Sequence, residues 1–155
     1  MKNKLPLIVL VVFVAFTSVQ MSFAAEEYAE IISYSTSDNE TSVDAGSVSA
    51  SINGGGDLVI SVYNAYPSYE AYVDFTIENT DEEVTLYLSE ILINNVYSGV
   101  EMDVAVTYFD GTPIPIDTEL APGATMDCLV TITILPAALE DESYSFSIDL
   151  NFDSD

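Results

Sequence analysis

Carboxylates are the only side chains in this sequence with the number and chemistry to form a reactive site. The chain carries 26 Asp and Glu, no His, and only two basic residues, Lys2 and Lys4. This composition excludes nucleophilic catalysis with an imidazole base, His-ligated zinc chemistry and a cationic clamp for phosphate. A pair of carboxylates could still hydrolyse a glycosidic bond. However, the chain has no Trp to help build the aromatic cleft such enzymes usually present, so we expect no enzymatic activity.

The carboxylates gather in three clusters that fall in expected turns or tails. Hard oxygen ligands without nitrogen or thiolate suit calcium, which takes six to eight oxygens in flexible geometry. The sequence therefore predicts calcium as a cofactor, although it contains no Asp-x-Asp-x-Asp-Gly loop, and a solvated acidic surface is the alternative. The candidate ligands are Asp81, Glu82, Glu83, Glu140, Asp141 and Glu142, with Asp149, Asp153 and Asp155 forming the third cluster.

The charge also limits the partners. Both lysines precede the first acidic residue, so the chain after Lys4 has 26 acidic side chains and no basic one, a formal charge of −26. Such a surface repels nucleic acid and anionic lipid. Copies of the chain also repel one another at close approach, because the screening length at physiological ionic strength is still about 8 Å. We therefore expect assembly to need high salt, acid or divalent cations.

Residues 1–25 have the pattern of a secretory signal peptide. The two lysines precede an apolar run over residues 5–16, and the small residues Ser22 and Ala24 fit a peptidase site. Cleavage after Ala24 or Ala25 would release a secreted, cell-surface chain of about 130 residues. The membrane is then contacted only through this segment, and an uncleaved anchor is the alternative.

The lone Cys128 cannot form an intrachain disulfide, and its strand context predicts a buried thiol.

Residues 26–43 predict an amino-terminal arm followed by a linker. An apolar patch covers residues 28–34, and residues 35–42 are polar without a core-forming pattern. Asn39-Glu40-Thr41 is a glycosylation sequon, so Asn39 is a candidate glycan acceptor.

Residues 44–155 alternate apolar and polar side chains with period two, which is typical of half-buried strands. Residues 48–52 lead through Asn53-Gly54-Gly55-Gly56-Asp57, a turn signal, into residues 58–62, and this predicts a hairpin. The clearest strand spans residues 71–78. Further strands are expected at 84–93, 104–108, 126–134 and 144–152, and one turn of helix near 136–139. About seven short strands indicate an all-β domain, an antiparallel β-sandwich of jelly-roll or immunoglobulin-like kind.

Two stretches carry a resemblance to a known family. These are Asn64-Ala-Tyr-Pro-Ser-Tyr-Glu-Ala-Tyr-Val-Asp-Phe-Thr-Ile-Glu-Asn-Thr80 and Leu120-Ala-Pro-Gly123 before a Thr/Ile/Val strand. With the signal peptide, residues 45–152 resemble the exported β-sandwich subunits of the TasA/camelysin type and their archaeal relatives in bundling pili and surface tubes. The metalloprotease label sometimes given to camelysin-like chains gains no support, because the sequence has no His-Glu-x-x-His.

The resemblance implies a homopolymer in which the amino-terminal segment of one subunit adds a strand to the sheet of the next. In such β-augmentation, backbone hydrogen bonds supply affinity and alternate side chains fill pockets. The segment with Tyr28, Ile31, Ile32 and Tyr34 is the candidate donor, with Ile32 as a plug on the same face as Tyr28 and Tyr34. Pairing of this arm within its own sheet is the alternative.

We therefore expect a secreted structural subunit of an extracellular filament, pilus-like fibre or surface layer, assembled by strand donation with calcium. The rival is a monomeric extracellular module for adhesion or carbohydrate binding, tethered to the membrane if the signal is not cleaved. Four tyrosines around Pro67 could give that module a sugar-stacking platform or could be packing residues. They are Tyr63, Tyr66, Tyr69 and Tyr72.

Overall fold

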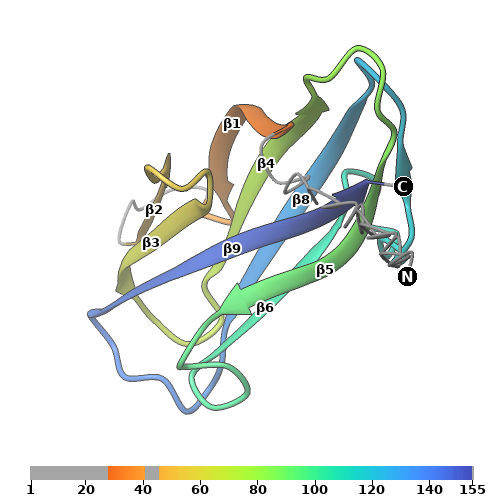
Figure 1. Ribbon diagram of the computed structural model, residues 1–155. Helices are drawn as coiled ribbons and strands as arrows, with labels where there is room; N and C mark the ends of the chain where they lie inside the picture. Colours follow the sequence, from red (N-terminus) through yellow and green to blue (C-terminus); the bar gives the residue numbers. More distant parts are fainter. Residues whose placement is uncertain (1–27, 41–45, 155) are drawn as a thin grey trace, which may run out of the picture.

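A computed structural model describes residues 28–40 and 46–154 as a chain of strands joined by turns (Figure 1). Within these residues there are nine strands and no helix, and the segment expected to form a helical turn near 136–139 is an irregular turn. The strands are β1 (Ala29–Asp38), β2 (Ser47–Ile52), β3 (Leu58–Ala65), β4 (Glu70–Asn79), β5 (Leu86–Asn94), β6 (Met102–Tyr108), β7 (Glu119–Leu120), β8 (Thr125–Ile134) and β9 (Glu142–Ser154).

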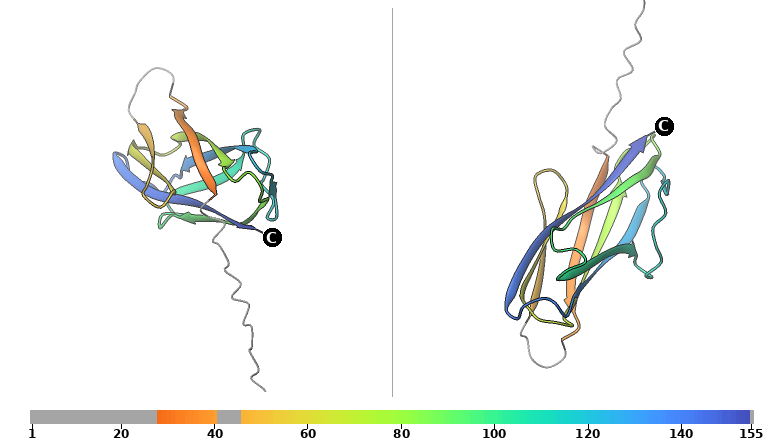
Figure 2. Two further views of the ribbon diagram at one scale, coloured as in Figure 1. Left: turned by 45° about the horizontal axis from the view of Figure 1, so that its top comes forward. Right: turned by 90° about the horizontal axis from the view of Figure 1, so that it is seen from below.

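The strands form two sheets that face each other across a shared core (Figure 2). The four-stranded sheet has the order β1-β4-β8-β6, and the five-stranded sheet has the order β2-β3-β9-β5-β7. Every strand pair is antiparallel. The predicted antiparallel β-sandwich is therefore confirmed.

The predicted hairpin of β2 and β3 is also present. The side-chain oxygen of Asn53 accepts hydrogen bonds from the backbone N–H groups of Gly55 and Asp57, at 2.8 and 3.1 Å. Gly56 has φ of +93°, a left-handed value that residues with a Cβ rarely adopt. The chain reverses direction here because Gly56 adopts the left-handed backbone conformation and the Asn53 side chain bonds the backbone of the turn.

The core consists of the inward side chains of the alternating strands. In β4 the pattern is regular, with Ala71, Val73, Phe75 and Ile77 buried. Cys128 is fully buried as expected, and burial followed by the charge of Asp127 raises the pKa of its thiol to about 12. The thiol therefore stays protonated at neutral pH.

The first strand differs most from the expectation. The polar residues 35–38, expected to belong to a linker, continue β1, and β1 pairs with β4 of its own sheet. A strand can form here without an apolar pattern because its backbone pairs with β4 while the outward side chains remain in solvent. The expected boundary between residues 43 and 44 lies within residues 41–45, outside the described part.

Candidate assembly interface

β1 is the edge strand of the four-stranded sheet. It pairs with β4 along its whole length, from Ala29 opposite Asn79 to Asp38 opposite Ala71. Most of its side chains are exposed, and only those at its ends and Ile31 are half-buried. Because backbone hydrogen bonds hold it more than burial does, β1 occupies a position that a strand of the same sequence from another copy could also occupy.

A β-bulge at Ile32 determines which side chains of β1 point inward. Ile31 lies opposite Ile77 and Tyr34 lies opposite Phe75, so Ile32 is an extra residue without a partner on β4. Directly opposite residues in an antiparallel pair share a face, so Ile31 and Tyr34 are on the core side. The expectation that Ile32 and Tyr34 share a face is therefore wrong. Ile32 is 49% exposed and does not act as a plug in this arrangement.

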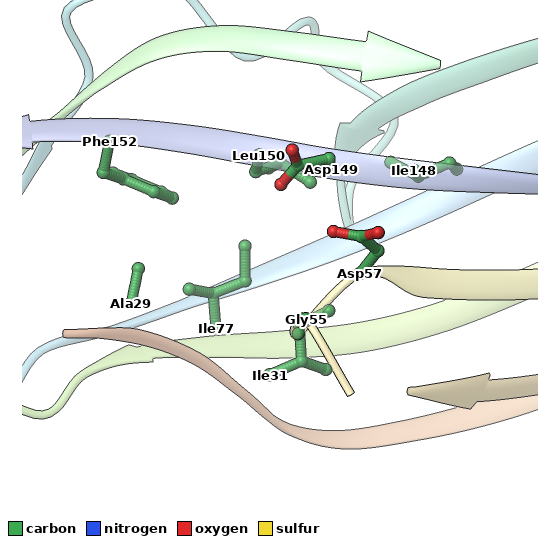
Figure 3. Close-up of a pocket in the computed structure, with 10 residues that line it drawn as sticks. Ala29, Ile31, Gly55, Asp57, Ile77, Ile148, Asp149, Leu150 and Phe152 are labelled. Atoms are coloured by element: carbon green, nitrogen blue, oxygen red, sulfur yellow. The ribbon is translucent and has the colours of Figure 1, made fainter. Parts of the chain in front are cut away.

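The inward side chains of β1 close one side of the sandwich. Ala29 and Ile31 on β1, with Ile77 on β4, face Leu150 and Phe152 on β9 across a cavity of about 90 Å³ (Figure 3). Without β1, this cavity and the apolar side chains of β4 would open to solvent. The seat for β1 is therefore the backbone edge of β4 together with a groove that combines apolar side chains with the carboxylates of Asp57 and Asp149.

Thr80 holds the start of β1. Its backbone N–H and its side-chain hydroxyl both donate to the carbonyl oxygen of Tyr28, at 2.8 and 3.0 Å. The Tyr28 side chain is half-buried against the core, and its backbone carbonyl makes the contact with Thr80. Thr80 thus fixes where a strand begins when it occupies this seat.

A cluster around the β3–β4 turn holds the other end of β1, and we call residues 38–40 with their partners the latch. The hydroxyl of Tyr69 donates to Asp38 Oδ2 at 3.1 Å, and that of Tyr66 donates to Glu40 Oε1 at 3.0 Å. The backbone N–H of Asn39 donates to the Glu70 carbonyl at 3.0 Å. Hydrogen bonds to carboxylates are stronger than neutral ones, so the latch is a firm attachment.

The latch leads to a prediction about alkaline pH. The pKa of Tyr69 is raised, first by burial and then by the charge of Asp38. A raised pKa favours the neutral phenol in the folded state, so its contribution is complete below pH 10 and is lost as pH rises above that value. We expect Tyr69→Phe to lower the free energy of unfolding by about 1.5 kcal/mol at pH 7. We also expect it to flatten the fall of Tm above pH 10.

Thermal melts between pH 7 and pH 11 measure this effect. The exposed Tyr63 provides the control, since Tyr63→Phe should leave both Tm at pH 7 and the alkaline slope close to wild type. Equal melts for Tyr69→Phe and wild type across the range would show that the latch adds no stability.

The four tyrosines near Pro67 do not form a platform for sugar. Tyr69 is fully buried, and Tyr66 packs against it with ring centroids 5.5 Å apart. Tyr72 donates its hydroxyl to Glu70 at 2.7 Å. Two of the four rings therefore belong to the latch and its packing, which supports the alternative of packing residues.

The two stretches that carried the family resemblance meet in space. Asn79 ends β4 and is fully buried, and its Nδ2 donates to the carbonyls of Val84 and Leu120 at 2.8 and 3.0 Å. Its backbone N–H donates to Ala124, and its carbonyl accepts from Gly123, both at 3.0 Å. Asn79 thus links the four-stranded sheet to β7 of the five-stranded sheet. The Asn-Thr pair at 79–80 and the Leu-Ala-Pro-Gly turn consequently have structural roles.

The acidic clusters do not converge into a metal site. Residues 81–83 follow β4 at one end of the sandwich, whereas residues 140–142 lie at the start of β9 at the other. Asp81 already accepts hydrogen bonds from the backbone N–H groups of Glu83 and Val84, both at 2.7 Å. In residues 28–40 and 46–154, no three Asp, Glu or Cys side chains gather closely enough to hold a metal ion. Within the described residues, the predicted ligands therefore do not form one preformed site.

The sequence features linked to export fall partly outside the described residues. The signal segment, residues 1–25, lies outside the described residues, and so does Asp155 of the third acidic cluster. Asn39 is exposed, but its Nδ2 donates to the Ser68 carbonyl at 3.3 Å and its Oδ1 accepts from the Glu70 N–H at 3.2 Å. A glycan on Asn39 would therefore sit within the latch. None of the described elements is a helix long and apolar enough to cross a membrane.

Sequence patterns alone did not identify Thr80, Tyr69 and Asn79 as the residues that hold the first strand and join the sheets. The polar Asn-Thr pair directly after the alternating strand was the available signal, because a buried strand end needs polar partners.

Comparisons with protein-family models, with curated proteins and with solved structures each find no match. The structure itself shows an all-β, two-sheet antiparallel domain.

Proposed function

We propose that this protein is a secreted structural subunit of an extracellular filament, of the TasA/camelysin kind, in which β1 of one copy occupies the seat on β4 of the next. The observation that carries the proposal is the seat itself. It is an edge position beside a groove lined partly by apolar side chains, and it is attached to β1 by Thr80 at one end and by the latch at the other.

A strand held in this way can exchange between copies without new interactions. The same nine paired positions, the same Thr80 contact and the same latch form whether β1 comes from its own chain or from a neighbour. Exchange therefore depends on protein concentration and on the barrier to opening, because every hydrogen bond broken within one chain forms again between two chains. Glu30 lies directly opposite Glu78, and like charges placed so weaken the pairing at the start of β1.

Cations would assist the assembly by reducing repulsion. Subunits with 26 carboxylates and no cation after Lys4 approach each other only if the charge is screened or bound. Calcium shared between carboxylates of adjacent copies is the version we favour, and divalent cations should then act at far lower ionic strength than sodium chloride does.

Electron microscopy of the mature protein with and without millimolar calcium tests the proposal. We expect filaments in calcium, few or none in low salt with a chelator, and reversal when chelator is added to calcium-treated samples. Sodium chloride at matched ionic strength is the control. If sodium chloride has the same effect as calcium, screening alone is sufficient and calcium is not a cofactor. Discrete particles under every condition would contradict a filament subunit.

One surface favours a second candidate function, binding of a neutral carbohydrate. A hollow of about 310 Å³ on the four-stranded sheet is lined by Ser33, Asp74, Thr76 and Asp127, beside the exposed ring of Phe109. Carboxylates and hydroxyls accept hydrogen bonds from sugar hydroxyls, and a ring can stack on a sugar face. Retention of monomer on an insoluble polysaccharide, lost in Phe109→Ala, would support this function over the first.

A further inference from the structure

The most exposed large apolar side chains of the described residues belong to two neighbouring loops at one end of the sandwich. Val96, Leu139 and Val100 are 86%, 65% and 63% exposed. They belong to the β5–β6 and β8–β9 loops, which lie at the same end of the ribbon (Figure 1). A 2.8 Å hydrogen bond from the Leu135 N–H to the Glu101 carbonyl joins the two loops. We call these three side chains the end patch. Apolar side chains so exposed mark an interaction surface when they cluster.

The end patch lies at the same end as the latch. Ser68, whose carbonyl accepts from Asn39, donates its N–H to the Ile134 carbonyl at 3.0 Å. Ile134 directly precedes the loop that bears Leu139. Gly46, where the chain continues into β2, also lies here, because its N–H donates to Glu40 Oε1 at 2.9 Å. The exit from β1, the entry into β2 and the end patch therefore share one end of the domain.

The length of the chain between β1 and β2 limits how subunits can exchange strands. Glu40 and Gly46 are separated by six peptide steps, which span at most about 20 Å when fully extended. If β1 of one copy occupies the seat of another, Glu40 lies at the latch end of the acceptor and Gly46 at the latch end of the donor. These two ends must then lie within about 20 Å of each other.

We infer that the end patch is covered by the latch end of the neighbouring copy with which the chain exchanges β1, in an offset contact that leaves each copy able to contact the next one in the filament. The inference rests on the proposed function, since strand exchange is what brings the two ends together. Two independent observations converge on it: the short connection selects this end, and the same end carries the most exposed apolar side chains of the described residues. The contact adds side-chain burial to a strand exchange that by itself creates no new interactions.

The charge around the end patch gives the contact a cation dependence. Glu101 and the cluster Glu140, Asp141 and Glu142 border the two loops. Two copies meeting here bring these carboxylates together with no basic side chain to offset them. Screening or bound cations are therefore needed at this contact.

Cross-linking in assembled full-length protein tests the inference. In Leu139→Cys, a short bismaleimide should join neighbouring copies in most of the material. In the matched control Phe109→Cys, whose residue is similarly exposed at 62% but lies at the opposite end of the sandwich, cross-linking should stay at background. The native Cys128 is buried and provides the background in unsubstituted protein. The variant Val96→Ser/Val100→Ser/Leu139→Ser should raise the protein concentration required for assembly at least tenfold, and Phe109→Ser should not.

A second measurement separates this inference from the strand exchange on which it rests. A disulfide formed between Ser35→Cys of one copy and Asp74→Cys of another reports exchange alone, because these two side chains contact each other across β1 and β4. If that disulfide forms but Leu139→Cys cross-links no better than Phe109→Cys, or the triple serine variant assembles like wild type, the end patch is not the contact. If that disulfide fails to form, strand exchange is wrong and the inference is overturned with it.

Discussion

Replacing Asn79 with alanine is expected to destabilise the domain more than any other single polar substitution we consider. The side chain is fully buried and makes three hydrogen bonds, two from Nδ2 and one to Oδ1 from the Asp81 N–H at 3.1 Å. Its removal takes the partner from two carbonyls and one N–H, of which the Leu120 carbonyl is buried and the other two groups are part-buried. Each buried unpaired group costs about 1–3 kcal/mol, so the total loss should be on the order of 4 kcal/mol.

Thermal and chemical unfolding measure this loss, and we expect Tm to fall by roughly 10 °C or more for a domain of this size. Asn94→Ala is the matched control, because Asn94 is exposed and its side chain makes one 3.3 Å bond to Ser147. Asn79→Asp should be nearly as damaging as Asn79→Ala, since it loses both donors and buries a charge. A Tm for Asn79→Ala within 2 °C of wild type would contradict the role of Asn79 as the link between sheets.

The second large effect is expected from a charge placed on the inner face of β1. Ile31 points into the groove beside Ile77, whereas the neighbouring Ile32 is the extra residue of the bulge and is half exposed. A carboxylate at position 31 would be buried with no cation near it, at a cost of several kcal/mol. We expect Ile31→Asp to abolish assembly and to lower Tm, while Ile32→Asp assembles nearly as wild type does.

Sedimentation and electron microscopy of the two full-length variants give the comparison. Each variant adds the same charge at adjacent positions, so any difference reports the direction of the side chain and not the net charge. A truncated chain that begins at Gly46 lacks β1 and gives a further check. A synthetic peptide of residues 28–40 should bind this truncated chain and raise its Tm. The same peptide with Ile31→Asp should bind at least tenfold more weakly. Equal assembly of both full-length variants would show that the inner face of β1 is not what the seat recognises.

The strands of the core and the β2–β3 turn could be predicted because their signals are local. In β4, apolar and polar side chains alternate without interruption, and the asparagine and glycines between β2 and β3 meet the geometric demands of a tight turn. Such patterns depend only on the pleat of a strand and on backbone conformation.

Pairing and register could not be predicted in the same way. β1 pairs with β4, about 40 residues later in the chain, and alternation does not encode partners. The bulge at Ile32 places Ile32 and Tyr34 on different faces of β1, because one inserted residue changes the side of the residues before it. The acidic clusters looked equivalent in sequence, yet the sandwich places residues 81–83 and 140–142 at opposite ends.

The central claim is that β1 of one copy occupies the seat on β4 of another, and a disulfide between two singly substituted proteins tests it most directly. Ser35 and Asp74 lie opposite each other and contact at 3.4 Å. Ser35→Cys protein mixed with Asp74→Cys protein, then placed under assembling conditions and oxidised, should form a disulfide-linked heterodimer. Ser35→Cys mixed with Glu78→Cys, four residues along β4, should form little, because the register is wrong. The Ser35→Cys/Asp74→Cys double variant is the control, because its intrachain disulfide shows that this pair of cysteines can react. If that disulfide forms efficiently but assembled material contains no Ser35→Cys–Asp74→Cys heterodimer, strand exchange is contradicted.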